Sequence, residues 1–249
     1  MLAFAVALLA TPPDHSAWDA LLKRYVTAES RVDYQRWKNS DLPALDSYLA
    51  RLAAPWPAAL TGQDRKASLI NSYNALMVRW VLANYPVRSS WATPKPFVAS
   101  RHTLNGEMVS LDTIETRLRN MGDPRVHAVL VCAARSCPPL RREAYSGEKL
   151  DAQLDDNARA WLANHDLNEF FPGQRLARVS HIFKWYSNDF GSVEAFLARF
   201  APPDRSAFLR EGNVKIEYKD YHWGLNDTSP LGADYGGVRF LWDYFWNKR

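Results

Sequence analysis

The sequence predicts an α+β protein, a helix-rich single domain around a small, mostly antiparallel sheet. Apolar residues recur at helical spacing in several stretches, which is typical of amphipathic helices. One short segment carries an Asn-Gly pair, the strongest short-range signal for a β-hairpin. The 249 residues are 47% hydrophobic, which is ample for one substantial core. Residues 14–249 are therefore expected to form one domain.

The charge pattern narrows the possible partners. The net charge is only +4, and no block of five or six like charges occurs, so we expect no nucleic-acid partner. The sequence has no Gly-rich phosphate loop, and its histidines and cysteines lack the spacing of a zinc site. No cofactor and no metal are therefore expected.

The first ten residues, MLAFAVALLA, are wholly apolar and are followed by Thr-Pro-Pro-Asp. Such a segment is too short to span a bilayer. It is similar to the apolar core of a signal peptide but lacks the basic segment that normally precedes it. Residues 1–13 are interpreted as a possible, truncated signal peptide, which favours a periplasmic or secreted protein. The alternative is a helix buried in the fold of a cytoplasmic protein.

The N-terminal half is expected to be mainly helical. Ser16 can cap a helix over 17–28, residues 31–34 form a short extended piece, and Asp41 can cap a further helix. The apolar faces of these two helices are Trp18, Leu21, Leu22 and Tyr25, then Leu42, Leu45, Tyr48, Leu49 and Leu52.

A long helix is predicted over 64–85, with Pro86 ending it. Asn74 occupies a position in its apolar seam, and a buried amide needs hydrogen-bond partners. Either Asn74 holds a neighbouring loop in place, or its amide orients a catalytic group or binds substrate.

The remaining elements alternate between short strands and helices. Residues 102–109 predict a hairpin, Ser110 can cap a helix over 111–121, and residues 147–165 form another amphipathic helix. Short helices are expected at 193–200 and 205–210. Residues 214–221 alternate in the manner of a strand, and the aromatic segment 240–246 is expected to pack as a helix or strand.

The segment 123–145 carries both cysteines of the chain. Its apolar run at 126–131 predicts a strand buried on both faces. Cys137 precedes two prolines, which predicts a helix start, where the helix dipole would lower the thiol pKa. Such a cysteine is a candidate nucleophile. Inert packing is the competing interpretation, which suits Cys132 better than Cys137, and a Cys132–Cys137 disulfide is a third.

His127 is the first candidate for the base. If it opened a strand, its Cα would lie roughly 16 Å from that of Cys132, at about 3.3 Å per residue. Cys137 would then reach His127 only if the intervening residues folded back. Otherwise another histidine would be needed, with His102 preferred over His181 and His222.

Six blocks of the sequence resemble the domain-of-unknown-function 547 family. They are SRVDYQRWKN, LINSYNALMV, SLDTIETRLR, DPRVHAVLVCAARSCPPLRREAY, HIFKWYSNDF and DYHWGLN. The resemblance implies a papain- and transglutaminase-like fold, or a circularly permuted form of it, with a cysteine at a helix N-terminus facing a histidine on a sheet. Cys137 and His127 match the family cysteine and histidine, and Asn74, Glu115 and Arg119 also match. The family's usual Glu-His pair is Glu115-Thr116 here.

Together these observations predict a cysteine-dependent hydrolase or acyl transferase acting on an amide of a peptide-like or small-molecule substrate. The expected catalytic residues are Cys137, His127 and Glu115. The expected substrate-binding residues are Asn74, Tyr73, Ser136, Arg135 and Arg119. The alternative is a non-catalytic binding or scaffold domain with the same fold, and a redox role of the cysteine pair is a third idea.

Overall fold

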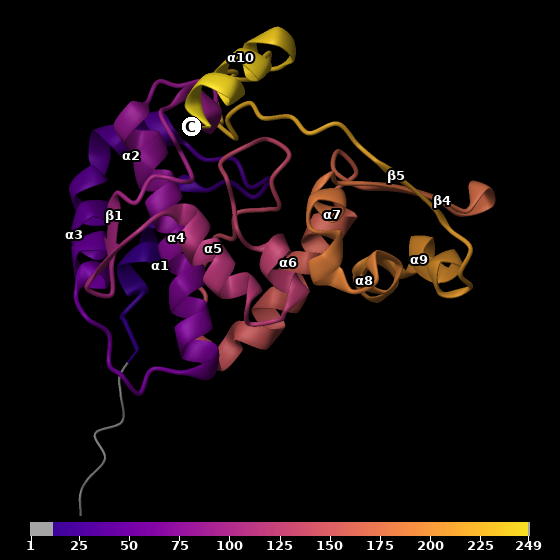
Figure 1. The fold of residues 1–249 in the computed structure, drawn as a ribbon, viewed down its shortest axis with the longest axis horizontal. Helices are drawn as coiled ribbons and strands as arrows, with labels where there is room; N and C mark the ends of the chain where they lie inside the picture. The colour runs from indigo at the N-terminus through magenta and orange to yellow at the C-terminus, as the bar shows by residue number, and fades with distance from the viewer. Residues whose placement is uncertain (1–11, 249) are drawn as a thin grey trace, which may run out of the picture.

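The computed structural model of the protein describes residues 12–248. The apolar segment at residues 1–10 that suggested a signal peptide lies outside the described residues. Helices predominate and are accompanied by two small sheets, so the predicted α+β class is confirmed. Figure 1 shows α1 to α4 gathered at one end of the molecule and β4, β5, α8 and α9 at the other.

Four helices build the N-terminal end: α1 (Ser16–Tyr25), α2 (Tyr34–Ser40), α3 (Leu42–Ala53) and α4 (Gly62–Asn84). The predicted apolar face of α1 is buried as expected. Ser16 is not its cap, because the Asp14 carboxylate accepts hydrogen bonds from the Ser16 N–H and hydroxyl instead. The helix ends before residue 28 because Val26 pairs with Val32, in the short extended piece that the sequence predicted.

Helix α4 is central to this end and packs against α2, α3 and α5. Every residue from Lys66 to Val78 is buried, so the helix is enclosed on all sides and not on one stripe only. Its two asparagines, Asn71 and Asn74, must therefore find hydrogen-bond partners inside the protein. Those partners turn out to be backbone groups of the segment that carries the cysteines.

The predicted hairpin is present as β1 (His102–Leu104) and β2 (Glu107–Val109), which pair antiparallel. Asn105 and Gly106 both have positive φ, 52° and 78°, as a two-residue hairpin turn requires. Helix α5 (Leu111–Arg119) follows, and its cap is the predicted one, since Ser110 Oγ accepts a hydrogen bond from the Thr113 N–H at 3.0 Å.

Two expectations for the cysteine segment were wrong. The apolar run at 126–131 is buried as predicted but forms no strand: it begins in the 3-10 helix η2 (Pro124–Ala128) and continues as irregular chain. No helix begins at Cys137 either, and regular structure resumes only at η3 (Gly147–Lys149). The backbone groups here are satisfied by side-chain amides from neighbouring helices, which a local pattern does not reveal.

The C-terminal half begins with α6 (Leu150–Ala163), close to the predicted 147–165. A second sheet contains β3 (Glu169–Phe171), β4 (Leu176–Val179) and β5 (Lys215–Tyr218), with β3 antiparallel and β5 parallel to β4. The other elements are η1 (Ser90–Ala92), η4 (Pro172–Gln174), α7 (Ile182–Trp185), η5 (Ser187–Phe190), α8 (Val193–Phe200) and α9 (Pro203–Arg210).

The aromatic C-terminal segment forms α10 (Gly237–Asn247), which projects at the edge of the molecule in Figure 1. Phe240 stacks on Trp223 with ring centroids 5.5 Å apart, and Tyr244 packs against Trp91. The opposite face does not pack against the described chain, and its exposed side chains are Val238, Leu241, Trp242, Phe245 and Trp246. Within residues 12–248 no helix is both long and apolar enough to cross a bilayer.

Candidate functional site

The site is built around residues 132–137, here called the dithiol loop. Asn74 holds the chain just before it, because its Nδ2 donates to the Val129 carbonyl at 2.9 Å and its Oδ1 accepts from the Val131 N–H at 3.0 Å. Asn157 of α6 donates to the carbonyls of Ala128 and Pro139, at 2.6 Å and 3.0 Å. Two helices therefore fix both ends of the dithiol loop through side-chain amides.

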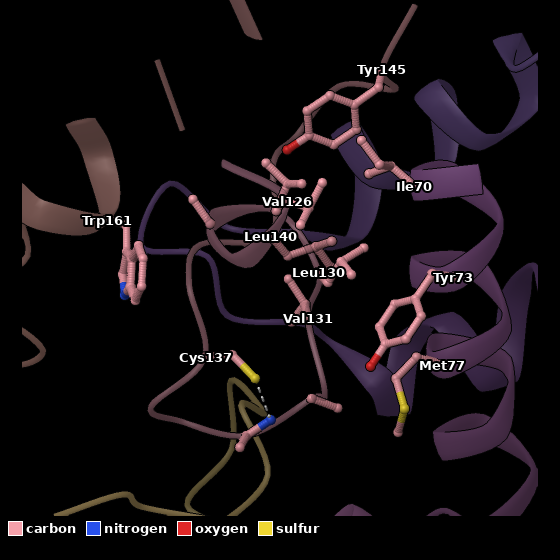
Figure 2. Close-up of a cluster of buried hydrophobic side chains, with 14 of the residues drawn as sticks. Ile70, Tyr73, Met77, Val126, Leu130, Val131, Cys137, Leu140, Tyr145 and Trp161 are labelled. Carbon is pink, nitrogen blue, oxygen red and sulfur yellow. Dashed lines mark hydrogen bonds between the residues drawn. The ribbon is translucent and has the colours of Figure 1, made fainter. Parts of the chain in front are cut away.

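The sulfur of Cys137 lies at the centre of this loop, among buried side chains (Figure 2). It accepts hydrogen bonds from the backbone N–H of Cys132 at 3.1 Å and of Ala134 at 3.4 Å. The two N–H groups converge because Ala133 has a left-handed conformation, φ 64°, which is unusual for a residue with a Cβ. Such strain is typical of functional loops.

The two thiols share one hydrogen-bonding partner. Both cysteines are free, and the Tyr221 hydroxyl lies 3.3 Å from each sulfur. The hydrogen bond with the Cys137 thiol lowers the pKa of Cys132 below that of an ordinary thiol. Burial raises the pKa of Cys137 well above it, and the neighbouring Cys132 adds to the increase. The two pKa shifts thus have opposite directions, downward at Cys132 and upward at Cys137.

A hollow of about 240 Å³, here called the aromatic cavity, opens beside Cys132. His127 and Glu115 line it together with Tyr73, and Trp91, Trp185, Trp223 and Phe97 form much of its wall. Burial raises the pKa of Glu115, and the neighbouring Tyr186 hydroxyl opposes the shift. Glu115 thus holds its proton more strongly than an exposed carboxyl and is able to donate it.

Asp189 and Tyr186 hold the His127 ring in place. Its Nε2 lies 2.8 Å from Asp189 Oδ2, and Asp189 is in turn paired with Arg119, whose Nε lies 2.5 Å from the same oxygen. The ring packs against Tyr186 at 4.3 Å between centroids. Burial lowers the pKa of His127 to about 4, although Asp189 opposes the shift, so the ring is neutral at pH 7. With Nε2–H donated to Asp189, Nδ1 is the unprotonated nitrogen.

A second hollow of about 510 Å³, here called the arginine cavity, is lined by the C-terminal part of the dithiol loop. Arg135, Ser136 and Cys137 of the loop line it, together with Arg31 from the N-terminal end of the protein. The dithiol loop thus contributes Cys132 to one cavity and Cys137 to the other.

The residues predicted from the sequence are therefore divided among three positions. His127, Glu115 and Tyr73 gather in the aromatic cavity, whereas Cys137, Ser136 and Arg135 line the arginine cavity. The remaining two line neither cavity: Asn74 ties down the dithiol loop, as one of its two interpretations held, and Arg119 supports Asp189.

The other histidines considered as bases lie elsewhere. His102 has a buried Nε2 with no partner and lines neither cavity, and His181 Nδ1 lies 3.2 Å from the Lys219 carbonyl. His222 lines the arginine cavity, but its Nδ1 accepts from the Gly224 N–H and its Nε2 donates to the Ala233 carbonyl. Among the residues described, no histidine is hydrogen-bonded to either thiol.

Three residues of the site were not among the catalytic or substrate-binding residues expected from the sequence: Cys132, Asp189 and Tyr221. For Cys132, packing was the preferred interpretation, beside a disulfide or a redox role with Cys137. Asp189 lies in the block HIFKWYSNDF, and Tyr221 lies in DYHWGLN, so the family-like blocks were the available signal. Within residues 12–248, no group of three or more His, Cys, Asp or Glu side chains is placed to hold a metal ion.

Part of the chain matches a known protein family. Residues 57–162 match the model of a family described as "Protein of unknown function, DUF547". This segment includes α4, α5, η2, the dithiol loop and most of α6. No curated protein and no solved structure matches the chain. Over the segment that carries Asn74, Glu115, His127 and both cysteines, the chain therefore resembles the DUF547 family.

Proposed function

We propose that the protein is a cysteine-dependent hydrolase or acyl transferase that acts on an amide of a peptide-like substrate, with Cys132 as the attacking thiol. The observation that carries this proposal is the shared position of Cys132 and the Asp189-anchored His127 in one aromatic cavity. A thiol with a lowered pKa and an oriented imidazole are the two parts of a thiol nucleophile. In this proposal Cys137, the nucleophile expected from the sequence, supports Cys132, and burial raises the pKa of the Cys137 thiol.

In the proposed reaction His127 Nδ1 accepts the Cys132 proton as the sulfur attacks the substrate carbonyl carbon. An S–C bond forms, and the carbonyl π electrons move to the oxygen. When the tetrahedral intermediate collapses, the C–N bond breaks and the leaving nitrogen takes the proton from His127. Water, or a second nucleophile in the transferase, then attacks the thioester carbonyl and gives its proton to His127. The C–S bond breaks, the acyl product leaves, and His127 returns the proton to the Cys132 sulfur.

The other groups of the aromatic cavity have supporting roles. Asp189 orients the His127 ring and stabilises the imidazolium that forms during attack. Glu115 and Tyr186 both line the cavity, where the Tyr186 hydroxyl, and Glu115 when it is protonated, can donate to the developing oxyanion. Tyr73 and the tryptophan walls exclude water and contact the substrate.

The test is to trap the thioester. Wild-type protein is incubated with small p-nitrophenyl esters, and the adduct is located by intact-mass and peptide mass spectrometry. We expect one acyl group on Cys132 and no adduct on Cys132→Ala. On His127→Ala the adduct should form more slowly but persist longer, because His127 serves both the attack and the hydrolysis. The chain contains only two cysteines, so the assignment is unambiguous.

Cys137→Ser is the matched variant, since it should still form the adduct, at a reduced rate. An adduct that forms on Cys137, or equally fast in Cys132→Ala, would refute Cys132 as nucleophile. If no ester, amide or thioester acylates either cysteine, the protein is a non-catalytic binding domain.

A further inference from the structure

The arginine cavity contains two guanidinium groups that lack carboxylate partners. Among residues 12–248, no Asp or Glu oxygen lies within 4.0 Å of Arg31 or Arg135. By contrast, Arg125 near the same loop pairs with three carboxylates. Arg31 and Arg135 therefore lack the carboxylate partners that Arg125 has.

Arg135 is fixed and only partly satisfied. Its Nη2 donates to the Ser229 carbonyl at 3.2 Å, while its Nε is buried and has no partner in the described chain. An N–H that is buried without an acceptor is costly, and in a native structure it calls for an explanation such as a bound ligand.

Arg31 faces the same cavity and makes no side-chain hydrogen bond with the described residues. Burial lowers the pKa of Arg31, and the charge of Arg135 lowers it further, while the Asp166 carboxylate opposes the shift. The two cations therefore repel each other across the cavity. An anion placed between them would remove this repulsion and supply the acceptors that both guanidinium groups lack.

We propose that the arginine cavity is a binding site for a small oxyanion, a carboxylate or a phosphate, held by Arg31 and Arg135. The planar fork of a guanidinium matches both anions, and Ser30 and Ser136 bring further polar groups to the cavity. Glu29, Asp166 and Asp220 also contribute to the lining but are exposed, so they form the solvent-facing rim. Their charge disfavours large polyanions and favours a ligand with a single anionic group.

This site does not depend on the proposed catalysis, because it lies on the Cys137 side of the dithiol loop and uses neither Cys132 nor His127. It can be tested even if the protein has no hydrolase activity.

The experiment measures binding of inorganic phosphate and of N-acetylglycine to the full chain by isothermal titration calorimetry, at an ionic strength held constant with potassium chloride. We expect saturable binding of one of them or both, and the tighter ligand identifies the anion class. Arg31→Gln should weaken the tighter ligand at least tenfold. Since the Arg31 side chain makes no hydrogen bond in the described structure, this variant should fold.

Arg135→Lys keeps the positive charge but removes the planar guanidinium with its paired N–H donors. We expect its affinity for the anion to lie between those of the wild type and Arg31→Gln. Arg142→Gln is the control, because Arg142 is exposed, bonds only the Lys23 carbonyl and lies outside the cavity. Binding of neither anion, or unchanged affinity in Arg31→Gln, would overturn the proposal.

Discussion

The paired hydrogen bonds of Asn74 make a sharp prediction about the dithiol loop. Asn74→Ala removes both bonds and leaves the Val129 carbonyl and the Val131 N–H without partners inside the core, where these residues are 1% and 4% exposed. Each stranded backbone group costs about 1–3 kcal/mol, so we expect a loss of about 3 kcal/mol or more in the free energy of unfolding. For a chain of this size that corresponds to about 6–12 °C in Tm.

Asn71→Ala is the matched control. Asn71, one turn earlier in α4, makes an equivalent pair of hydrogen bonds. Its Nδ2 donates to the Tyr145 carbonyl at 2.8 Å, and its Oδ1 accepts from the Tyr145 N–H at 2.9 Å. Asn71 does not touch the dithiol loop. Both variants should lose similar stability in urea unfolding. Only Asn74→Ala should abolish the preference of iodoacetamide for Cys132 over Cys137, since only that variant releases the loop.

A loss below about 1 kcal/mol for Asn74→Ala would contradict the reasoning, because that is the net worth of a single ordinary hydrogen bond. Equal effects of the two variants on the labelling ratio would show that the loop is not positioned by Asn74.

Three further predictions concern strain, pH and capping. Ala133→Gly should stabilise the protein by about 0.5–1 kcal/mol in urea unfolding, because glycine adopts the left-handed conformation of residue 133 without the steric cost of a Cβ atom. A clear destabilisation would show that Ala133 is not strained. The folded pKa of His127, about 4, lies below its ordinary value of 6.5, so its contribution to stability is complete above pH 6.5 and is lost as pH falls toward 4, by on the order of 3 kcal/mol. His127→Gln should reduce the dependence of the unfolding free energy on pH but not abolish it, because the pKa values of His15 and His102 are also lowered to about 4. An unchanged pH dependence would contradict the assignment to His127. Ser110→Ala should cost about 1 kcal/mol in thermal unfolding, because it removes the cap of α5, and a loss under about 0.3 kcal/mol would count against the cap.

The sequence was sufficient wherever a structure is determined by neighbouring residues. The β1–β2 hairpin follows from the Asn-Gly turn, the start of α5 follows from Ser110, and the extent of α4 follows from its apolar spacing and the proline after it. In each case the decisive contacts lie within a few positions along the chain.

The cysteine segment shows why other features could not be predicted. A β-branched apolar run indicates burial equally well for a strand and for irregular chain, and the choice depends here on amides of α4 and α6 that lie far away in sequence. The two prolines after Cys137 suggested a helix start, but their missing N–H groups suit irregular chain equally well.

The same limit applied to the candidate site. The sequence identified His127, Glu115 and Tyr73, which the fold brings into one cavity. It did not indicate which cysteine faces them, because that depends on the left-handed turn at Ala133, a residue with no local signal for such a conformation. It also could not show that Arg135 and Ser136 belong to a second cavity.

The most direct test of the account is the rate of alkylation of each cysteine as a function of pH. Wild-type protein is treated with iodoacetamide from pH 5 to 10, and labelling at Cys132 and Cys137 is followed by peptide mass spectrometry. We predict that Cys132 reacts about tenfold faster than Cys137 at neutral pH, with a pKa below that of an ordinary thiol, and that Cys137→Ala raises the pKa of Cys132. Faster labelling of Cys137, or a Cys132 pKa that does not respond to Cys137→Ala, would contradict the central claim that the pair is poised with Cys132 as its reactive member.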